Sequence, residues 1–66
     1  MKLQDIVNEG YSIVTTVNRP ADERGCTGYA VMTKKLGAIV CVAAKYRDDE
    51  YTIPVIMGVR EVKNVG

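Results

Sequence analysis

The residues that could carry chemistry are few in this chain and lie far apart along it. There is no histidine, and the two cysteines are Cys26 and Cys41. A nucleophilic mechanism needs a general base beside a Ser, Cys or Thr, and without histidine only Asp, Glu or Lys could serve. No nucleophile stands at a recognisable spacing from such a base. The sequence therefore predicts a protein that is not an enzyme.

The acidic residues form two clusters, Asp22-Glu23 and Asp48-Asp49-Glu50. Both fall in expected turns, and a carboxylate pair acting as acid and base needs a cleft that separates its pKa values. Two cysteines without histidine are too few for a four-ligand metal site. The glycine spacing within 25–28 is too short for a phosphate-binding loop. We therefore expect neither a metal nor a cofactor.

Composition places the chain among small globular proteins. Its 66 residues, 47% hydrophobic and 26% charged, predict one compact β-rich domain over 1–66. The apolar residues are mostly Val and Ile, which favour strands. Nine basic and eight acidic residues leave a net charge of +1. That balance gives no broad attraction to nucleic acid or to an anionic membrane.

The chain has no apolar run of membrane-spanning length, and residues 1–5 lack the apolar core of a signal peptide. We expect no membrane partner and a cytoplasmic location, in the protein's own cell or in a host cell.

The elements that would position any functional residue are organised around 38–44, seven apolar residues in a row. A short run of this kind predicts a strand buried on both faces. Further strands are expected at 11–17, 26–34, 51–57 and 59–63. Residues 2–9 favour a short helix that stops at Gly10, with a first strand as the alternative. The fold class is mainly β (α+β): a small antiparallel sheet of four or five strands, or an SH3-like or OB-like barrel, with a short N-terminal helix.

Hairpin registers predict which side chains share a face. A loop at Asp48-Asp49 pairs Tyr46 with Tyr51, and a loop at Leu36-Gly37 pairs Val42 with Val31. One face then collects the larger side chains and is the expected main core: Tyr29, Val31, Val40, Val42, Ile53, Val55 and Met57. The other collects mostly smaller ones: Ala30, Met32, Ile39, Cys41, Ala43 and Ile56.

Both faces should be covered, because burying a Val or Ile is worth about 1.5–3 kcal/mol. The cover could come from closure into a barrel, from the N-terminal helix, or from a second copy of the chain.

The same registers constrain the cysteines and the fourth strand. Cys41 faces Met32, so Cys26 should lie about 20 Å away, too far for a disulfide. Pro54 cannot donate to a sheet ladder, which makes the fourth strand an edge or places a bulge there. An exposed edge of this kind invites pairing with another chain.

The best candidate for function is the loop Asn18–Gly25, which is longer than an ordinary hairpin loop and carries two arginines and two acids. The expected partner-binding residues are Arg19, Asp22, Glu23 and Arg24 in this loop, with Arg47 and Tyr51 at the hairpin tip. We expect a non-enzymatic protein-interaction module that docks on a protein partner through an edge and this loop. Phage-type inhibitors and small regulators are often modules of this size. A plain solvated connector is the alternative for the loop.

Two other functions remain open. A small β-barrel could bind single-stranded nucleic acid by stacking bases on Tyr29 and Tyr46 among basic residues, namely Lys34, Lys35, Lys45 and Arg47. A homodimer, formed through a sheet face or an edge, could bind a small ligand in a pocket at its interface.

Overall fold

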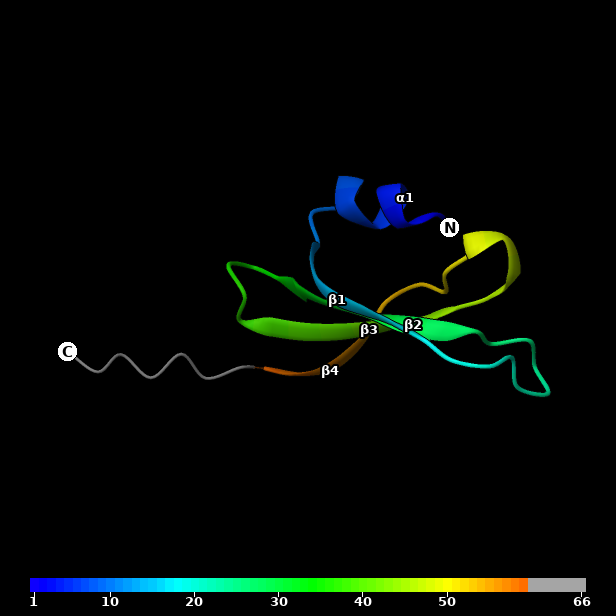
Figure 1. Ribbon diagram of the computed structural model, residues 1–66. Helices are drawn as coiled ribbons and strands as arrows, with labels where there is room; N and C mark the ends of the chain where they lie inside the picture. Colours follow the sequence, from blue (N-terminus) through cyan, green and yellow to red (C-terminus); the bar gives the residue numbers. More distant parts are fainter. Residues whose placement is uncertain (60–66) are drawn as a thin grey trace.

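The computed structural model describes residues 1–59 and shows a four-stranded antiparallel sheet in the order β1-β2-β3-β4 with one short helix (Figure 1). The elements are α1 (Leu3–Asn8), β1 (Ser12–Asn18), β2 (Gly28–Lys34), β3 (Ile39–Lys45), the 3-10 turn η1 (Arg47–Asp49) and β4 (Val55–Val59). The mainly β fold is confirmed, in its open-sheet form. The barrel does not form within these residues, because β1 and β4 stay at opposite edges. The strand expected at 59–63 lies outside the described residues, except for Val59.

The helix forms where its apolar spacing predicts and ends at the predicted glycine. The Lys2 N–H donates to the Asp5 carboxylate at 2.8 Å, which satisfies one free donor at the start of α1. At the other end Gly10 has φ +99°, and the N–H groups of Gly10 and Tyr11 donate to the carbonyls of Val7 and Ile6. This glycine-capped ending turns the chain from α1 into β1.

The central register is also as predicted. Val31 pairs with Val42 across β2 and β3, and Val42 pairs with Val55 across β3 and β4. The turn between β2 and β3 spans 35–38, two residues more than the loop expected at Leu36-Gly37, and it keeps the register. Met32 therefore faces Cys41, and both cysteines are free thiols.

The register differs from the prediction at the hairpin tip. Tyr51 pairs with Lys45 and not with Tyr46, although the Glu50 N–H still donates to the Arg47 carbonyl at 3.3 Å across Asp48 and Asp49. Asp48 and Asp49 both adopt positive φ, as the two central residues of a tight hairpin turn do. The register changes at Tyr46, whose N–H donates to the Glu50 carbonyl at 2.6 Å and which is one extra residue on the β3 side of the tip.

The predicted register holds at Val55 and Ile56, directly after Pro54, where β4 begins as an edge strand. It shifts again at a bulge, so that Val40 pairs with Gly58 and not with Met57.

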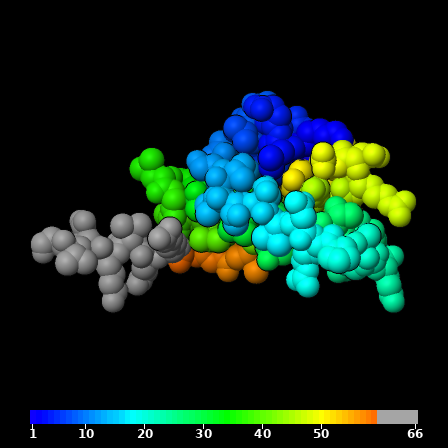
Figure 2. All heavy atoms as spheres, viewed as in Figure 1, coloured from blue at the N-terminus to red at the C-terminus, as the bar shows by residue number. Residues whose placement is uncertain are grey.

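The core lies on the face that carries the smaller side chains, contrary to the prediction. We call this the covered face, because α1 lies over it (Figure 1). Small residues at the sheet surface leave room for the helix to approach. The buried hydrophobic residues are Ile6, Ala30, Met32, Cys41, Ala43 and Tyr51. Figure 2 shows α1 and the hairpin tip gathered on one side of the molecule, with β4 on the other.

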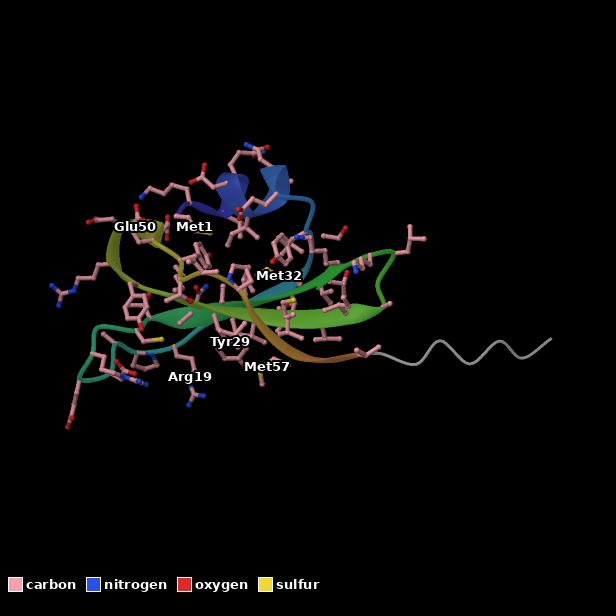
Figure 3. The ribbon with its side chains drawn as sticks, turned by 180° about the vertical axis from the view of Figure 1, so that it is seen from behind. Met1, Arg19, Tyr29, Met32, Glu50 and Met57 are labelled. Atoms are coloured by element: carbon pink, nitrogen blue, oxygen red, sulfur yellow. The ribbon has the colours of Figure 1, made fainter. Side chains whose placement is uncertain are left out.

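The opposite face of the sheet, which we call the open face, carries Val17, Tyr29, Val31, Val40, Val42, Val55 and Met57. Figure 3 shows Tyr29 and Met57 on this side and Met32 on the other. The members on β1 to β3 are half-buried by their neighbours, whereas Val55 is 61% and Met57 66% exposed. Within residues 1–59 no second layer lies over this face (Figure 1), so the expectation that both faces are covered fails for the single chain.

Candidate interaction surface

The loop between β1 and β2 is an ordered extension of that hairpin. The Arg19 N–H donates to the Thr27 carbonyl at 2.8 Å, and the Asp22 N–H donates to the Cys26 carbonyl at 3.1 Å. The Thr27 N–H donates in turn to the Lys45 carbonyl at 2.8 Å, which continues the ladder toward β3. The loop is therefore fastened to the sheet at its base and paired across its width.

Asp22 sets the shape of the loop tip. Its Oδ1 accepts the N–H groups of Arg24 at 2.9 Å and Cys26 at 3.0 Å, and its carbonyl accepts the N–H of Gly25. These donors, Cys26 first, hold the pKa of Asp22 below its ordinary value of 3.8. An Asp followed three residues later by a Gly is typical of such a turn. This predicted binding residue thus has a structural role in the loop.

The base of the loop tolerates only glycine at position 28. Gly28 has φ +151°, and a Cβ there would lie 2.0 Å from the Val17 carbonyl oxygen. Close by, the Lys45 ammonium donates to the Asn18 side chain at 2.8 Å and lies 3.5 Å from the Asp49 carboxylate. Lys45 therefore joins the start of the loop to the turn η1.

The hairpin tip is fastened to the start of α1. The Glu50 carboxylate accepts the N-terminal ammonium at 2.9 Å and lies 3.1 Å from the Lys2 ammonium. The hydrogen bond from the N-terminal ammonium is the main cause that holds the pKa of Glu50 below its ordinary value of 4.5. The Tyr51 N–H also donates to the Met1 carbonyl at 2.7 Å.

Tyr51 does not lie at the surface of the tip, where the sequence places it. Its residue is 8% exposed and packs in the core with Ile6 and Ala43. The physical reason is the one-residue register change at Tyr46, since such a change moves a strand side chain to the other face. Tyr51 is therefore a core residue in this structure.

The other five predicted residues meet at one end of the sheet, around two hollows that open to solvent. The first has a volume of about 520 Å³ and is lined by Arg19, Pro20, Ala21, Asp22, Cys26, Gly28 and Tyr29. The second has about 530 Å³ and is lined by Asp22, Glu23, Arg24, Gly25, Tyr46, Arg47 and Glu50. We call the exposed side chains Arg19, Asp22, Glu23, Arg24 and Arg47 the charged end. Asp22 belongs to both hollows, so the loop and the hairpin tip form one surface.

The charges of this surface are mixed and solvated. The Arg24 guanidinium lies 3.7 Å from the Asp22 carboxylate, and their side chains are 82% and 44% exposed. Within residues 1–59 no three His, Cys, Asp or Glu side chains gather as a metal site would require. The arrangement offers guanidinium donors and carboxylate acceptors to a partner that carries both signs of charge.

The residues expected to bind nucleic acid are dispersed. Tyr29 lies on the open face, whereas Tyr46 lines the second hollow. The Lys34 ammonium lies 4.5 Å from the ring centre of Tyr11, which packs against the core. Lys45 is engaged by Asn18 and Asp49, as described above. The geometry does not gather these lysines around Tyr29, and nucleic-acid binding stays a prediction.

Two features are not foreseen from the sequence. One is the contribution of Pro20, Cys26 and Tyr29 to the first hollow, for which their position beside the loop was the available signal. The other is the identity of the uncovered face.

None of the helices in residues 1–59 is long and apolar enough to cross a membrane.

Comparison of the chain with protein-family models, with curated proteins and with solved structures finds no match. Its function is therefore argued from its own geometry.

Proposed function

We propose that this protein is a non-enzymatic interaction module that docks on a protein partner through its charged end. The observation that carries the proposal is the contrast between a fixed loop backbone and free charged side chains. Asp22 and the ladder at Thr27 hold the loop in one shape, while the side chains of Arg19, Glu23 and Arg24 remain exposed. A loop ordered before binding loses less conformational entropy in the complex.

The chemistry of the charged end favours a folded protein surface over a polyanion. It combines three arginines with two acids, so neither sign of charge dominates. Arginine is enriched at protein interfaces because its planar guanidinium binds carboxylates through two parallel hydrogen bonds. The first hollow, with Pro20, Ala21 and Tyr29 in its lining, could receive an apolar side chain of the partner.

In this proposal the module acts in the cytoplasm as a small regulator or inhibitor, of the kind that phages encode. It needs no chemistry of its own, because occupying a surface of the partner is sufficient to block or redirect it.

The test replaces the two arginines of the loop that flank Asp22. Immobilised Arg19→Ala/Arg24→Ala protein should capture at least about tenfold less of its partner from native lysate than the unmodified protein. Its melting temperature should stay nearly unchanged, because both side chains are exposed. Lys35→Gln, which removes an exposed cation from the turn between β2 and β3, is the matched control and should capture normally.

Equal capture by the double variant would remove the loop from the proposed function. Capture that vanishes after nuclease treatment, with a steep loss as salt rises, would assign the surface to nucleic acid instead.

A further inference from the structure

We infer that the open face is covered by a second copy of this chain, which stacks its own open face upon it in a two-fold homodimer. The inference goes beyond the proposed function; the two surfaces meet at Arg19 and Tyr29, and the test therefore uses residues of β4, which line neither hollow. It depends on the size, the charge and the placement of the side chains on that face.

The first argument is the absence of charge from the open face. Its strand positions carry Val, Tyr, Met, Ala, Thr and Ser side chains, and the lysines of β2 and β3, Lys34 and Lys45, lie at positions that point to the covered face. An antiparallel sheet with one face in water normally carries polar residues on that face. Two open faces can meet without bringing like charges together, and a net charge of +1 adds little repulsion between copies.

The second argument is area. Four strands at a spacing of about 4.8 Å, and about six residues long at 3.3 Å each, make a face of roughly 20 Å by 20 Å. Because the side chains make that surface uneven, two such faces together bury about 1,000 Å², the lower limit for a specific interface. The area fits a dimer that is weak but specific, with a dissociation constant in the micromolar range.

The third argument distinguishes stacking from edge pairing. Pairing of β4 with the β4 of a second copy would extend the sheet and leave an open face twice as wide in water. Stacking instead buries Val55 and Met57, the two most exposed members of the face, against another apolar surface. Sheets packed in this way lie about 10 Å apart with their strands within about 30° of each other. Arg19 lies at the edge of the open face (Figure 3), as a polar rim residue would.

The test uses two neighbouring residues of β4 that point to opposite faces. Val55 pairs with Val42 on the open face, and Ile56 pairs with Cys41 on the covered face. Their exposed fractions are 61% and 66%, so a lysine at either position costs the monomer little. Val55→Lys should raise the dissociation constant of the dimer at least about tenfold, whereas Ile56→Lys should leave it unchanged.

Sedimentation equilibrium between about 5 and about 500 µM measures the association of all three proteins. Circular dichroism and melting at the lowest concentration verify that each variant is folded, and Met57→Gln replaces Val55→Lys if the latter is not. Unmodified protein that stays monomeric at the highest concentration overturns the inference. Equal weakening by both lysine variants, or weakening by Ile56→Lys alone, also overturns it, since either result would place the contact on the edge or on the other face.

Discussion

Both faces of the sheet are built mainly from apolar side chains, but only one of them is covered within residues 1–59. The covered face carries Ala30, Cys41 and Ala43, which are at most 1% exposed beneath α1. The open face carries larger residues, among them Val31, Val42 and Tyr29, yet they are only half-buried. The comparison teaches that apolar content alone does not decide which face becomes the core. A six-residue helix can seal only a face whose side chains are small enough for it to come close.

The largest expected difference, between the sealed core of the covered face and an uncovered part of the chain, comes from the same substitution at two isoleucines. Ile6 of α1 is fully buried against the covered face, and Ile53 is 75% exposed. Ile6→Ala should destabilise the fold by about 2–5 kcal/mol, a large part of the stability of a chain this small. Ile53→Ala should change it by less than about 0.5 kcal/mol. Urea unfolding measures both.

If Ile6→Ala is unfolded in water, Ile6→Val should still show a loss of about 0.5–1.5 kcal/mol. Equal losses at Ile6 and Ile53 would mean that α1 does not seal the covered face.

A smaller difference is expected from enlarging two adjacent alanines of β3. Ala43 is fully buried beneath α1, and Ala44 lies on the open face opposite Tyr29. Ala43→Leu should cost about 1–3 kcal/mol, because the added atoms push against a packed layer. Ala44→Leu should be close to neutral, since no helix or strand of residues 1–59 lies over the open face (Figure 1). A melting series at low protein concentration distinguishes the two, and a neutral Ala43→Leu would contradict close approach of the helix.

The smallest expected effect concerns the ion pairs that fasten the hairpin tip over the covered face. Because folding lowers the pKa of Glu50, its carboxylate stabilises the folded state at pH values above 4.5, the ordinary pKa of this group. That contribution is lost as the pH falls from 4.5 through the lowered pKa of the folded state. Glu50→Gln should therefore lower the melting temperature at neutral pH by roughly a few degrees. It should also reduce the fall in melting temperature that acidification causes.

Melting curves across acidic and neutral pH provide the measurement. Glu9→Gln, which removes an exposed carboxylate at the far end of α1, is the control and should follow the unmodified protein. A Glu50→Gln curve that keeps the full acid dependence would exclude this carboxylate as its source.

Sequence patterns predicted the structure correctly where it depends on the local sequence alone. The stop of α1 at Gly10, the pairing of Val31 with Val42 and the edge position of β4 all follow from spacing and from Pro54. The patterns failed where backbone conformation decides. Tyr46 is an extra residue at the hairpin tip, and the resulting register change carries Tyr51 into the core, which residue types did not indicate.

The candidate site was predictable in part for the same reason. Its loop was recognisable by length and charge, and its members Arg19, Asp22, Glu23 and Arg24 do lie together. That the loop lies beside Arg47 depends on the fold of the whole sheet. The choice of core face depends on how closely α1 approaches, which spacing along the chain does not encode.

The most direct test of the central claim, that the chain seals one face itself and leaves the other for a second copy, is the rate of methionine oxidation. Met32 is fully buried on the covered face, and Met57 is 66% exposed on the open face (Figure 3). Initial rates of oxidation by peroxide can be followed by mass spectrometry, because trypsin releases the two methionines in different peptides. We expect Met57 to react at least about tenfold faster than Met32 in dilute protein, and to slow markedly as the concentration passes through the micromolar range. Equal rates for the two methionines, or a Met57 rate that does not depend on concentration, would contradict the account.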